Sequence, residues 1–353
     1  MTDYLLSICI PTYNRAQIVY ECVKNCLKID SDAIEVVVND NCSSDETKNL
    51  LATIQDKRFS YYSNSNNIGY QNLAVVLSKC KGKFALLMSD EDEVFNVDWN
   101  AVLKQLEEDN STAVFQCEYF DEEEKRLVQG PEKVFEKDDA ETYCFVLRRC
   151  LYAGALIVKK SILDSVWNRI DKQSFMWSTY PQCVLPLYCI KYGDFRKLEG
   201  LYVRRTERNN KGTIASINKG EEPYWSVGAR LIQNEEWINL IFSMRLEEEK
   251  INKIFMEILI VNARQMVKYH GKLSSGNWKE SPTFSSRRDI IERDLKVSKA
   301  TWIRLFFKNK RILFLKEKEL LERNGMTYHK DKSYRKRMWK EYQTLIIQLI
   351  SRI

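Results

Sequence analysis

Short apolar runs alternate with amphipathic stretches through the first 90 residues of the chain. Apolar runs of strand length cover residues 5–10, 35–39, 59–62 and 84–88. Between them, apolar residues recur at intervals of three and four, the spacing of one helix face, in residues 19–27, 50–54 and 73–80. This order of strands and helices predicts an α/β fold with a mostly parallel sheet flanked by helices.

Two polar positions are placed to begin helices. Asn14 follows the break at Pro11 and is predicted to cap the first helix. Ser43, followed three residues later by Glu46, matches a capping box and is predicted to begin the second helix.

The alternating pattern continues to about residue 222 and then changes. It predicts helices at 99–108, after 161 and at 182–192, strands at 113–117, 151–158 and 195–205, a charged hairpin tip at 121–125, and a polar loop at 206–222. Gly154 marks either close approach to a ligand or tight packing. Later residues show only helical patterns, at 224–245, 247–270, 287–307, 311–324 and 333–351, with a linker at 271–286. We therefore expect one domain at residues 1–222 and a helical region at 223–353.

Polar side chains follow each of the first four predicted strands. These groups are residues 11–15, 40–44, 64–69 and 89–93. Ligands of open α/β sheets bind outside the carboxyl ends of the strands. The four groups are therefore expected to line one crevice.

The last of these groups, residues 89–93, contains four consecutive carboxylates. Residues two apart in an extended segment point to the same side, so Asp90 and Asp92 are expected to converge. Neighbouring negative charges repel one another, which indicates a divalent cation or a cationic partner at this place. A solvated acidic turn is the alternative interpretation.

The composition is that of a soluble globular protein, which we expect in the cytoplasm. Apolar residues make up 44% and charged residues 29% of the chain, and no apolar run is long enough to span a bilayer. The first residues lack the basic and apolar regions of a signal peptide. Ten cysteines without a CxxC pair and only two histidines favour reduced, buried thiols over a zinc site or a redox motif. The sequence contains neither GxGxxG nor GxxxxGK[ST], so a dinucleotide fold and a P-loop are not supported.

Positive charge is concentrated at the C-terminal end. Residues 301–353 contain 14 Lys or Arg and 5 Asp or Glu, a local charge of +9 in a chain of net charge +6. Apolar residues lie next to the basic ones in Trp302–Phe307 and Leu345–Ile350, as in helices at an anionic membrane surface. A peripheral membrane contact and a basic face that serves as a homo-oligomer contact are both consistent with this pattern. Nucleic-acid binding is not expected, because the charge does not accompany a recognised module.

Four segments carry a resemblance to a known family: LSICIPTYNR, VVVNDNCSSDET, NSNNIGYQN and GKFALLMSDEDEV. They resemble the nucleotide-sugar-binding half of family 2 glycosyltransferases with the GT-A fold. Within this family the chain is most similar to bacterial enzymes that build surface polysaccharides, including abequosyltransferase-like ones. The resemblance covers residues 5–125 well and 126–205 loosely. It implies inverting transfer of a sugar from a nucleotide diphosphate donor, most commonly a UDP-sugar, to a glycan or lipid-linked acceptor at the inner face of the membrane.

The resemblance also implies roles for residues of the first two loops. It places Pro11, Thr12 and Tyr13 around the base and ribose of the donor nucleotide. It gives Asp40, after the second strand, the role of reading the base.

The third and fourth polar groups receive roles in the same way. Asn67 and Gly69 would close over the nucleotide, Asp90 would contact the ribose or a metal, and Asp92 would bind Mn²⁺ or Mg²⁺ on the diphosphate. The chemistry needs such a cation, because negative charge grows on the departing diphosphate as the glycosidic bond breaks.

The chain departs from the family pattern after the NxG segment. Many members have an arginine there, whereas this chain has Gln71 and Asn72. A phosphate or base contact would then come from Arg15 or from the loop around Arg208.

A second departure concerns the general base. Many inverting members carry a Glu-Asp pair in the region that corresponds to residues 177–182, which here contains no carboxylate. Asp92, Glu93 or a residue of the loosely matched half could accept the proton, and His270 is a weaker candidate. A catalytically degenerate binding module and a nucleotidyltransferase are the alternative functions.

Overall fold

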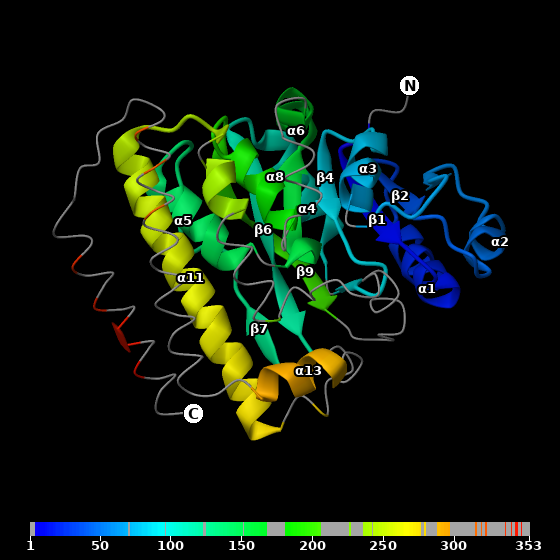
Figure 1. Cartoon of the computed structure of the whole chain (residues 1–353). Helices are drawn as coiled ribbons and strands as arrows, with labels where there is room; N and C mark the ends of the chain where they lie inside the picture. The colour runs from blue at the N-terminus through cyan, green and yellow to red at the C-terminus, as the bar shows by residue number, and fades with distance from the viewer. Residues whose placement is uncertain are drawn as a thin grey trace. The chain divides into compact units, whose positions relative to one another are not determined.

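The described part of the chain contains a nine-stranded sheet, shown in the computed structural model in Figure 1. The structure describes residues 4–69, 71–95, 97–122, 125–150, 152–167, 181–205, 226, 236–241, 243–276, 279 and 288–296, and single positions between 315 and 347. The strands are β1 (Leu6–Thr12), β2 (Ile34–Asp40), β3 (Phe59–Ser63), β4 (Phe84–Leu87), β5 (Glu93–Phe95), β6 (Thr112–Asp121), β7 (Arg126–Val128), β8 (Leu156–Lys159) and β9 (Asp194–Arg205). Their order is β3-β2-β1-β4-β8-β6-β9-β5, with β7 paired to β6.

Helices connect these strands and continue after them. They are α1 (Ala16–Leu27), α2 (Thr47–Leu51), α3 (Gln71–Lys79), α4 (Trp99–Glu108), α5 (Ala140–Arg149), the 3₁₀ helix η1 (Ala153–Ala155), α6 (Lys160–Trp167), α8 (Pro181–Cys189), α11 (Glu248–Ser275) and α13 (Arg288–Leu295).

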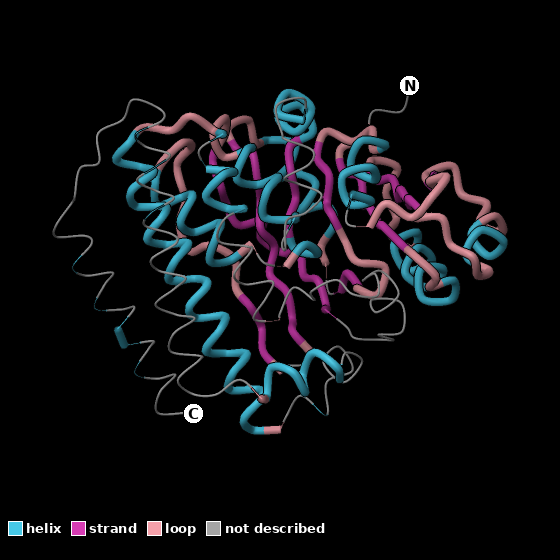
Figure 2. Tube along the Cα trace, in the orientation of Figure 1, coloured by secondary structure: helices cyan, strands magenta, loops and turns pink. Residues whose placement is uncertain are grey.

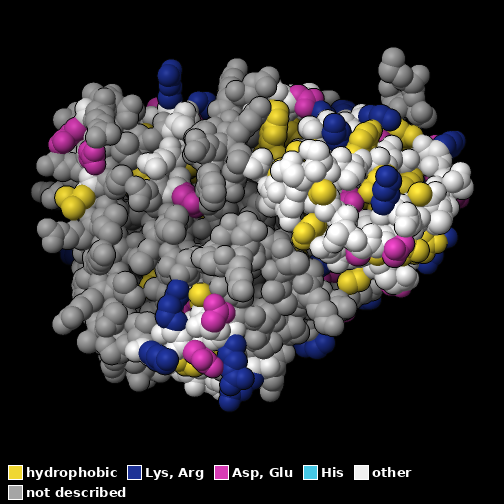
Figure 3. Space-filling model, turned by 45° about the vertical axis from the view of Figure 1, so that its right-hand side comes forward, with side chains coloured by type: hydrophobic (Ala, Val, Ile, Leu, Met, Phe, Trp, Pro, Cys, Tyr) yellow, Lys and Arg dark blue, Asp and Glu magenta, His cyan; other side chains and the backbone are white. Residues whose placement is uncertain are grey.

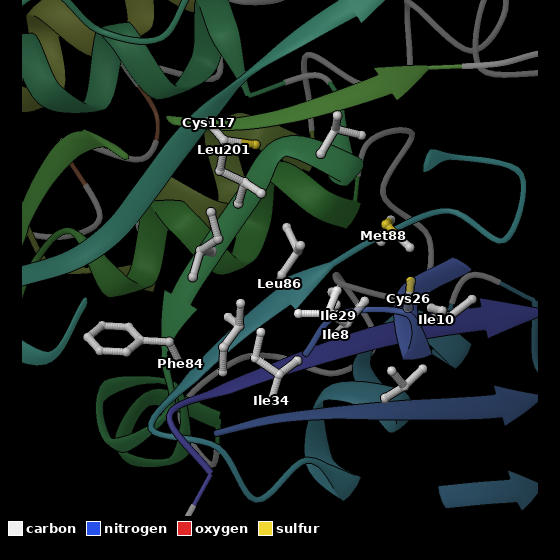
Figure 4. Packing of buried hydrophobic residues seen from close by; sticks show 14 of the residues in the cluster. Ile8, Ile10, Cys26, Ile29, Ile34, Phe84, Leu86, Met88, Cys117 and Leu201 are labelled. Atoms are coloured by element: carbon white, nitrogen blue, oxygen red, sulfur yellow. The ribbon is translucent and has the colours of Figure 1, made fainter. Parts of the chain in front are cut away.

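The first four strands have the parallel arrangement that the alternating pattern predicts. β1 pairs in parallel with β2 and with β4, and β2 pairs in parallel with β3. α1 buries Val19, Cys22, Val23 and Cys26, which occupy one face at helical spacing. These side chains belong to a buried cluster with residues of β1 and β4. Figure 4 labels Cys26 of α1, Ile8 of β1 and Leu86 of β4 in this cluster. The predicted first strand, first helix and core face are confirmed.

The second half of the sheet, whose strands Figure 2 draws in magenta, is mixed rather than parallel. β8 is antiparallel to β4 and to β6, and β6 is parallel to β9. β5 pairs antiparallel with β9, and β7 antiparallel with β6. The predicted strand at 151–158 is shorter in the structure, because η1 precedes β8 and directs the chain into the sheet between β4 and β6. A sequence pattern of strands and helices does not specify this direction of entry.

The two predicted helix caps are wrong. Asn14 has a φ of 52°, and α1 begins without a side-chain cap. α2 begins at Thr47, so Ser43 lies outside it. The Asn14 N–H instead donates to Ser43 Oγ at 2.8 Å, and the Ser44 N–H donates to Asn14 Oδ1 at 2.8 Å. These residues join the loops that follow β1 and β2.

The chain divides into two compact units. The first comprises Met1–Thr142, Arg149–Met176 and Pro181–Ser216, and it contains the sheet. The second comprises Tyr143–Arg148, Trp177–Tyr180 and Ile217–Ile353. Position 222, where we expect the domain boundary, lies outside the described residues, as does the predicted loop at 206–222.

In the second unit, α11 covers the predicted helix at 247–270 and extends to Ser275. Gly276 follows it with a φ of 76°, the left-handed conformation that commonly ends helices. The predicted linker therefore begins later than expected. α13 lies within the predicted helix at 287–307, and those predicted at 311–324 and 333–351 fall almost entirely outside the described residues. None of the described helices combines the length and the apolar character needed to cross a membrane.

Candidate active site

The carboxyl ends of β1, β2 and β4 lie side by side, because these strands are parallel neighbours. Thr12 stands opposite Asp40 in the β1/β2 register, and the Asn41 N–H donates to the Thr12 carbonyl at 2.9 Å. Thr12 Oγ1 donates to Asp90 Oδ2 at 2.7 Å. The first, second and fourth polar groups therefore meet at one edge of the sheet, as the strand-end pattern predicts.

Arg15 provides the positive charge that contacts the first part of the acidic loop. Its Nη1 donates to Asp90 Oδ1 at 2.8 Å and to Glu91 Oε2 at 3.1 Å. Burial acts to lower the pKa of Arg15, but the charges of Asp90 and Glu91 outweigh it and raise that pKa above its usual value. The sequence indicated either a divalent cation or a cationic partner for the acidic loop. For Asp90 and Glu91, the structure shows a cationic partner, which is Arg15.

Asp92 is buried and takes a hydrogen bond from a different part of the sheet. The Tyr152 hydroxyl, just before η1, donates to Asp92 Oδ2. Desolvation, followed by the charge of Asp92, raises the pKa of Tyr152 well above its ordinary value. The next carboxylate, Glu93, pairs with Arg204 Nη1 of β9 at 3.2 Å. No sequence pattern indicated Tyr152, whereas Arg204 lies at the end of β9 and could have been included by the rule that selected the other polar groups.

Asp40, at the end of β2, is also buried and hydrogen-bonded to two neighbouring segments. The Tyr61 hydroxyl of β3 donates to Asp40 Oδ2 at 2.8 Å, and the Ser43 N–H donates to Oδ1 at 3.0 Å. Desolvation, followed by the hydrogen bond to Asp40, raises the pKa of Tyr61 to about 12. Sequence reasoning missed Tyr61, because an aromatic residue in a strand is interpreted as packing.

Amide side chains tie the 64–69 loop to the end of β2. Asn41 Nδ2 donates to Asn67 Oδ1 at 2.7 Å and to the Gly69 carbonyl at 3.2 Å. Asn72 is buried, and its Nδ2 donates to the Asn39 carbonyl at 2.8 Å. Asn64 Nδ2 of the loop donates to Asn72 Oδ1 at 3.0 Å. Asn72, which stands where many members of the family that the chain resembles have an arginine, therefore links this loop to β2.

The other residues that we predict to bind the donor nucleotide lie around this hydrogen-bond network. Pro11 and Tyr13 are half-buried at the end of β1. Gly69 has a φ of 58°, which favours glycine, and an added Cβ would meet nothing within 4 Å. Residues 177–180, in the segment that corresponds to the family's general base, lie outside the described part of the chain.

The acidic loop fits a cation that is shared with a substrate. Among the described residues, no three His, Cys, Asp or Glu side chains are grouped so that they could hold a metal by themselves. Mg²⁺ sites commonly use one or two carboxylates together with substrate phosphates. A carboxylate has about four acceptor sites, so one that accepts hydrogen bonds, as Asp90 does from Thr12 and Arg15 and Asp92 does from Tyr152, can also bind a cation.

Comparisons with known proteins agree with this geometry. Residues 7–166 match the model of the family described as glycosyl transferase family 2. The chain is 28% identical over 204 residues to the abequosyltransferase RfbV of Salmonella typhimurium, covering 50% of this chain and 58% of that protein. It is 25% identical over 167 residues to the GalNAc(5)-diNAcBac-PP-undecaprenol beta-1,3-glucosyltransferase of Campylobacter jejuni, covering 45% and 53%. The chain thus spans little more than half the length of either relative.

A solved structure resembles a larger part of the chain. The S. aureus TarS fragment 1–349, crystallised with UDP-GlcNAc, has a TM-score of 0.58 at 16% identity and covers 92% of this chain and 93% of that one. At this identity the likeness concerns the fold, which is GT-A.

Proposed function

We propose that the protein transfers a sugar, with inversion, from a nucleotide diphosphate to a glycan or lipid-linked acceptor in bacterial surface-polysaccharide synthesis, because residues 7–166 match the model of glycosyl transferase family 2 and the relatives found are bacterial glycosyltransferases. One observation supports this proposal above the others. Three strand ends meet at Thr12, which contacts both Asp90 and the backbone next to Asp40. A nucleotide held at one strand end therefore lies beside the carboxylates at another.

In this proposal the donor nucleotide lies between the β1 loop and the 64–69 loop. Pro11, Thr12 and Tyr13 contact the base and ribose, and Asp40 reads the base. The bonds from Asn41 to the 64–69 loop support the assignment of Asn67 and Gly69 to the wall over the nucleotide, because they hold this loop next to β2.

We assign the metal to Asp92, with Asp90 as the second carboxylate. Bound Mn²⁺ or Mg²⁺ would supply positive charge where the diphosphate departs. Asp90 keeps its contacts to Thr12 and Arg15 in this role and offers its remaining acceptor sites. The proton of the acceptor hydroxyl would pass to Asp92, to Glu93 or to a residue of the loosely matched half, residues 126–205.

The proposal is tested first by donor binding and then by transfer. Thermal shift across UDP-, GDP-, CDP- and dTDP-sugars, with and without Mn²⁺, should identify a donor that stabilises the protein more strongly with metal. With that donor, EDTA and Asp92→Asn should each reduce transfer by about 100-fold or more. Asp32→Asn, which removes a 71% exposed carboxylate, is the matched control and should leave transfer unchanged.

Each outcome separates the candidate functions. Transfer that survives both EDTA and Asp92→Asn would refute the metal role. Nucleotide binding without turnover on any glycan or lipid-linked acceptor would indicate a degenerate binding module.

We further propose a cytoplasmic protein that contacts the inner face of the plasma membrane through residues 301–353 or uses this basic segment between subunits. On the face drawn in Figure 3, the acidic and basic side chains of the described residues are interspersed, so the described surface there offers no patch of one sign. Sedimentation of the full chain with neutral and anionic vesicles, with size-exclusion chromatography in parallel, tests both contacts. Equal sedimentation with the two kinds of vesicle would refute the membrane contact.

A further inference from the structure

Tyr152 links Asp92 to the second half of the sheet. Its hydroxyl donates to Asp92 Oδ2, although the two residues are 60 positions apart in the chain. Its ring packs against Tyr119 of β6, with the ring centroids 4.5 Å apart. The Arg205 guanidinium, at the end of β9, lies 5.8 Å from the centroid of the same ring. Neighbours from two strands therefore restrict the position of the ring that carries the donor hydroxyl.

Gly154 leaves the space in which these two side chains meet. A Cβ at this position would lie 2.5 Å from Asp92 Oδ2 and 2.6 Å from the Tyr152 hydroxyl. The ring of Tyr152 has little room to withdraw, because it packs on Tyr119. Of the two interpretations of Gly154, ligand approach or tight packing, the structure thus supports packing around the Asp92 contact.

We propose that Tyr152 positions the Asp92 carboxylate for the divalent cation, and thereby sets the affinity of the donor site for metal. This inference rests on the proposed function. The terminal torsion of an aspartate is soft, so a carboxylate without a fixed donor samples a broad range of orientations. A hydrogen bond to Oδ2 fixes the plane of the carboxylate, and a carboxylate that accepts such a bond can still bind a cation.

A phenol suits this role better than a basic side chain does. It donates a hydrogen bond without adding positive charge, so the carboxylate keeps the charge that attracts a metal. Asp90 of the same loop shows the contrast, because Arg15 brings a positive charge to within 2.8 Å of it. Hydrogen bonds that orient a metal-binding side chain typically change metal affinity or activity 10- to 100-fold.

The test replaces Tyr152 by Phe, which keeps the ring and removes the hydroxyl. Mn²⁺ binding is measured by electron paramagnetic resonance of the free ion, with Mn²⁺ alone and with UDP as a probe. Tyr152→Phe should raise the Kd for Mn²⁺ by about 10- to 100-fold and leave metal-free UDP binding unchanged. Tyr202→Phe is the matched control, since Tyr202 lies in the same sheet with its ring 6.1 Å from Phe95, and it should bind Mn²⁺ as the wild type does.

A second variant separates positioning from loss of folding. Gly154→Ala keeps the Tyr152 hydroxyl group, but its added methyl group should push the Tyr152 and Asp92 side chains apart. It should therefore weaken Mn²⁺ binding, as Tyr152→Phe does. Circular dichroism reports whether each variant is folded. Equal Mn²⁺ affinity in the wild type and in folded Tyr152→Phe would overturn this inference and leave the proposed sugar transfer standing. A wild-type protein that transfers sugar without binding Mn²⁺ would overturn the inference and the metal role together.

Discussion

Replacing Arg15 by Met should lower the free energy of unfolding by about 3 kcal/mol, because it removes the cation that contacts two carboxylates of the acidic loop. The Arg15 and Asp90 side chains are 8% and 6% exposed, and that of Glu91 is 17% exposed. Removing one partner of a buried ion pair costs about 3–5 kcal/mol. We expect the lower end, since Thr12 still donates to Asp90 and Glu91 can turn toward water.

Urea denaturation measures this loss directly, and thermal melting provides a second reading. For a unit of this size, 3 kcal/mol corresponds to a decrease in Tm of roughly 6–12 °C. Lys57→Met is the matched control, because Lys57 and Asp32 form an ion pair in which both side chains are more than 70% exposed, at 72% and 71%. Such a pair contributes roughly 0–1 kcal/mol.

A double-mutant cycle decides whether the effect comes from the pair. Asp90→Asn in the Arg15→Met background should recover part of the lost stability, because it removes a buried charge whose cation has gone. A variant Arg15→Met that unfolds within about 1 kcal/mol of the wild type, or additive effects of the two substitutions, would refute the reasoning.

Three further predictions concern residues at or near the strand ends of the proposed donor site. Cys42 has a φ of 66°, so Cys42→Gly should raise the free energy of unfolding by about 1 kcal/mol, and an unchanged urea midpoint would contradict this. Asn72→Leu removes the buried amide that bonds to Asn39, and it should cost about 2–3 kcal/mol and weaken UDP binding, whereas an unchanged Kd would show that the loop does not depend on it. The pKa of Tyr61 is raised to about 12, above the usual value of about 10, so its contribution to stability is complete below pH 10 and is lost as the pH rises toward 12. Ultraviolet difference titration of the wild type against Tyr61→Phe checks this, and ionisation near pH 10 in the folded protein would refute it.

The N-terminal half of the fold could be predicted because its signals are local. Each strand and helix there is specified by the spacing of its own apolar residues, and strands connected through helices run parallel in one sheet. β8 could not be placed in the same way. Its position between β4 and β6, and its antiparallel direction, depend on where the chain returns after α5, which no local pattern records.

The candidate site shows the same division. The rule that ligands bind at strand ends selected Thr12, Asp40 and Asp90, and the structure brings these residues together. The partners of these side chains could not be predicted, because they come from positions distant in the chain. The Tyr152 hydroxyl is one example, 60 residues from Asp92. Asn14 fails as a helix cap for a related reason, since its side chain bonds to the loop after β2.

The carboxylates of the acidic loop have two kinds of partner in the structure: arginines contact Asp90, Glu91 and Glu93, and a tyrosine hydroxyl contacts Asp92. Arg15 offsets the charge of Asp90 and Glu91, and Arg204 pairs with Glu93. Tyr152 holds Asp92 with a hydrogen bond that adds no positive charge. In the proposed metal role, Asp92 offers the cation a carboxylate that the Tyr152 hydroxyl orients without adding positive charge. The same division explains how four consecutive carboxylates are tolerated in a folded protein before any metal binds, because arginines compensate the carboxylates on either side of Asp92.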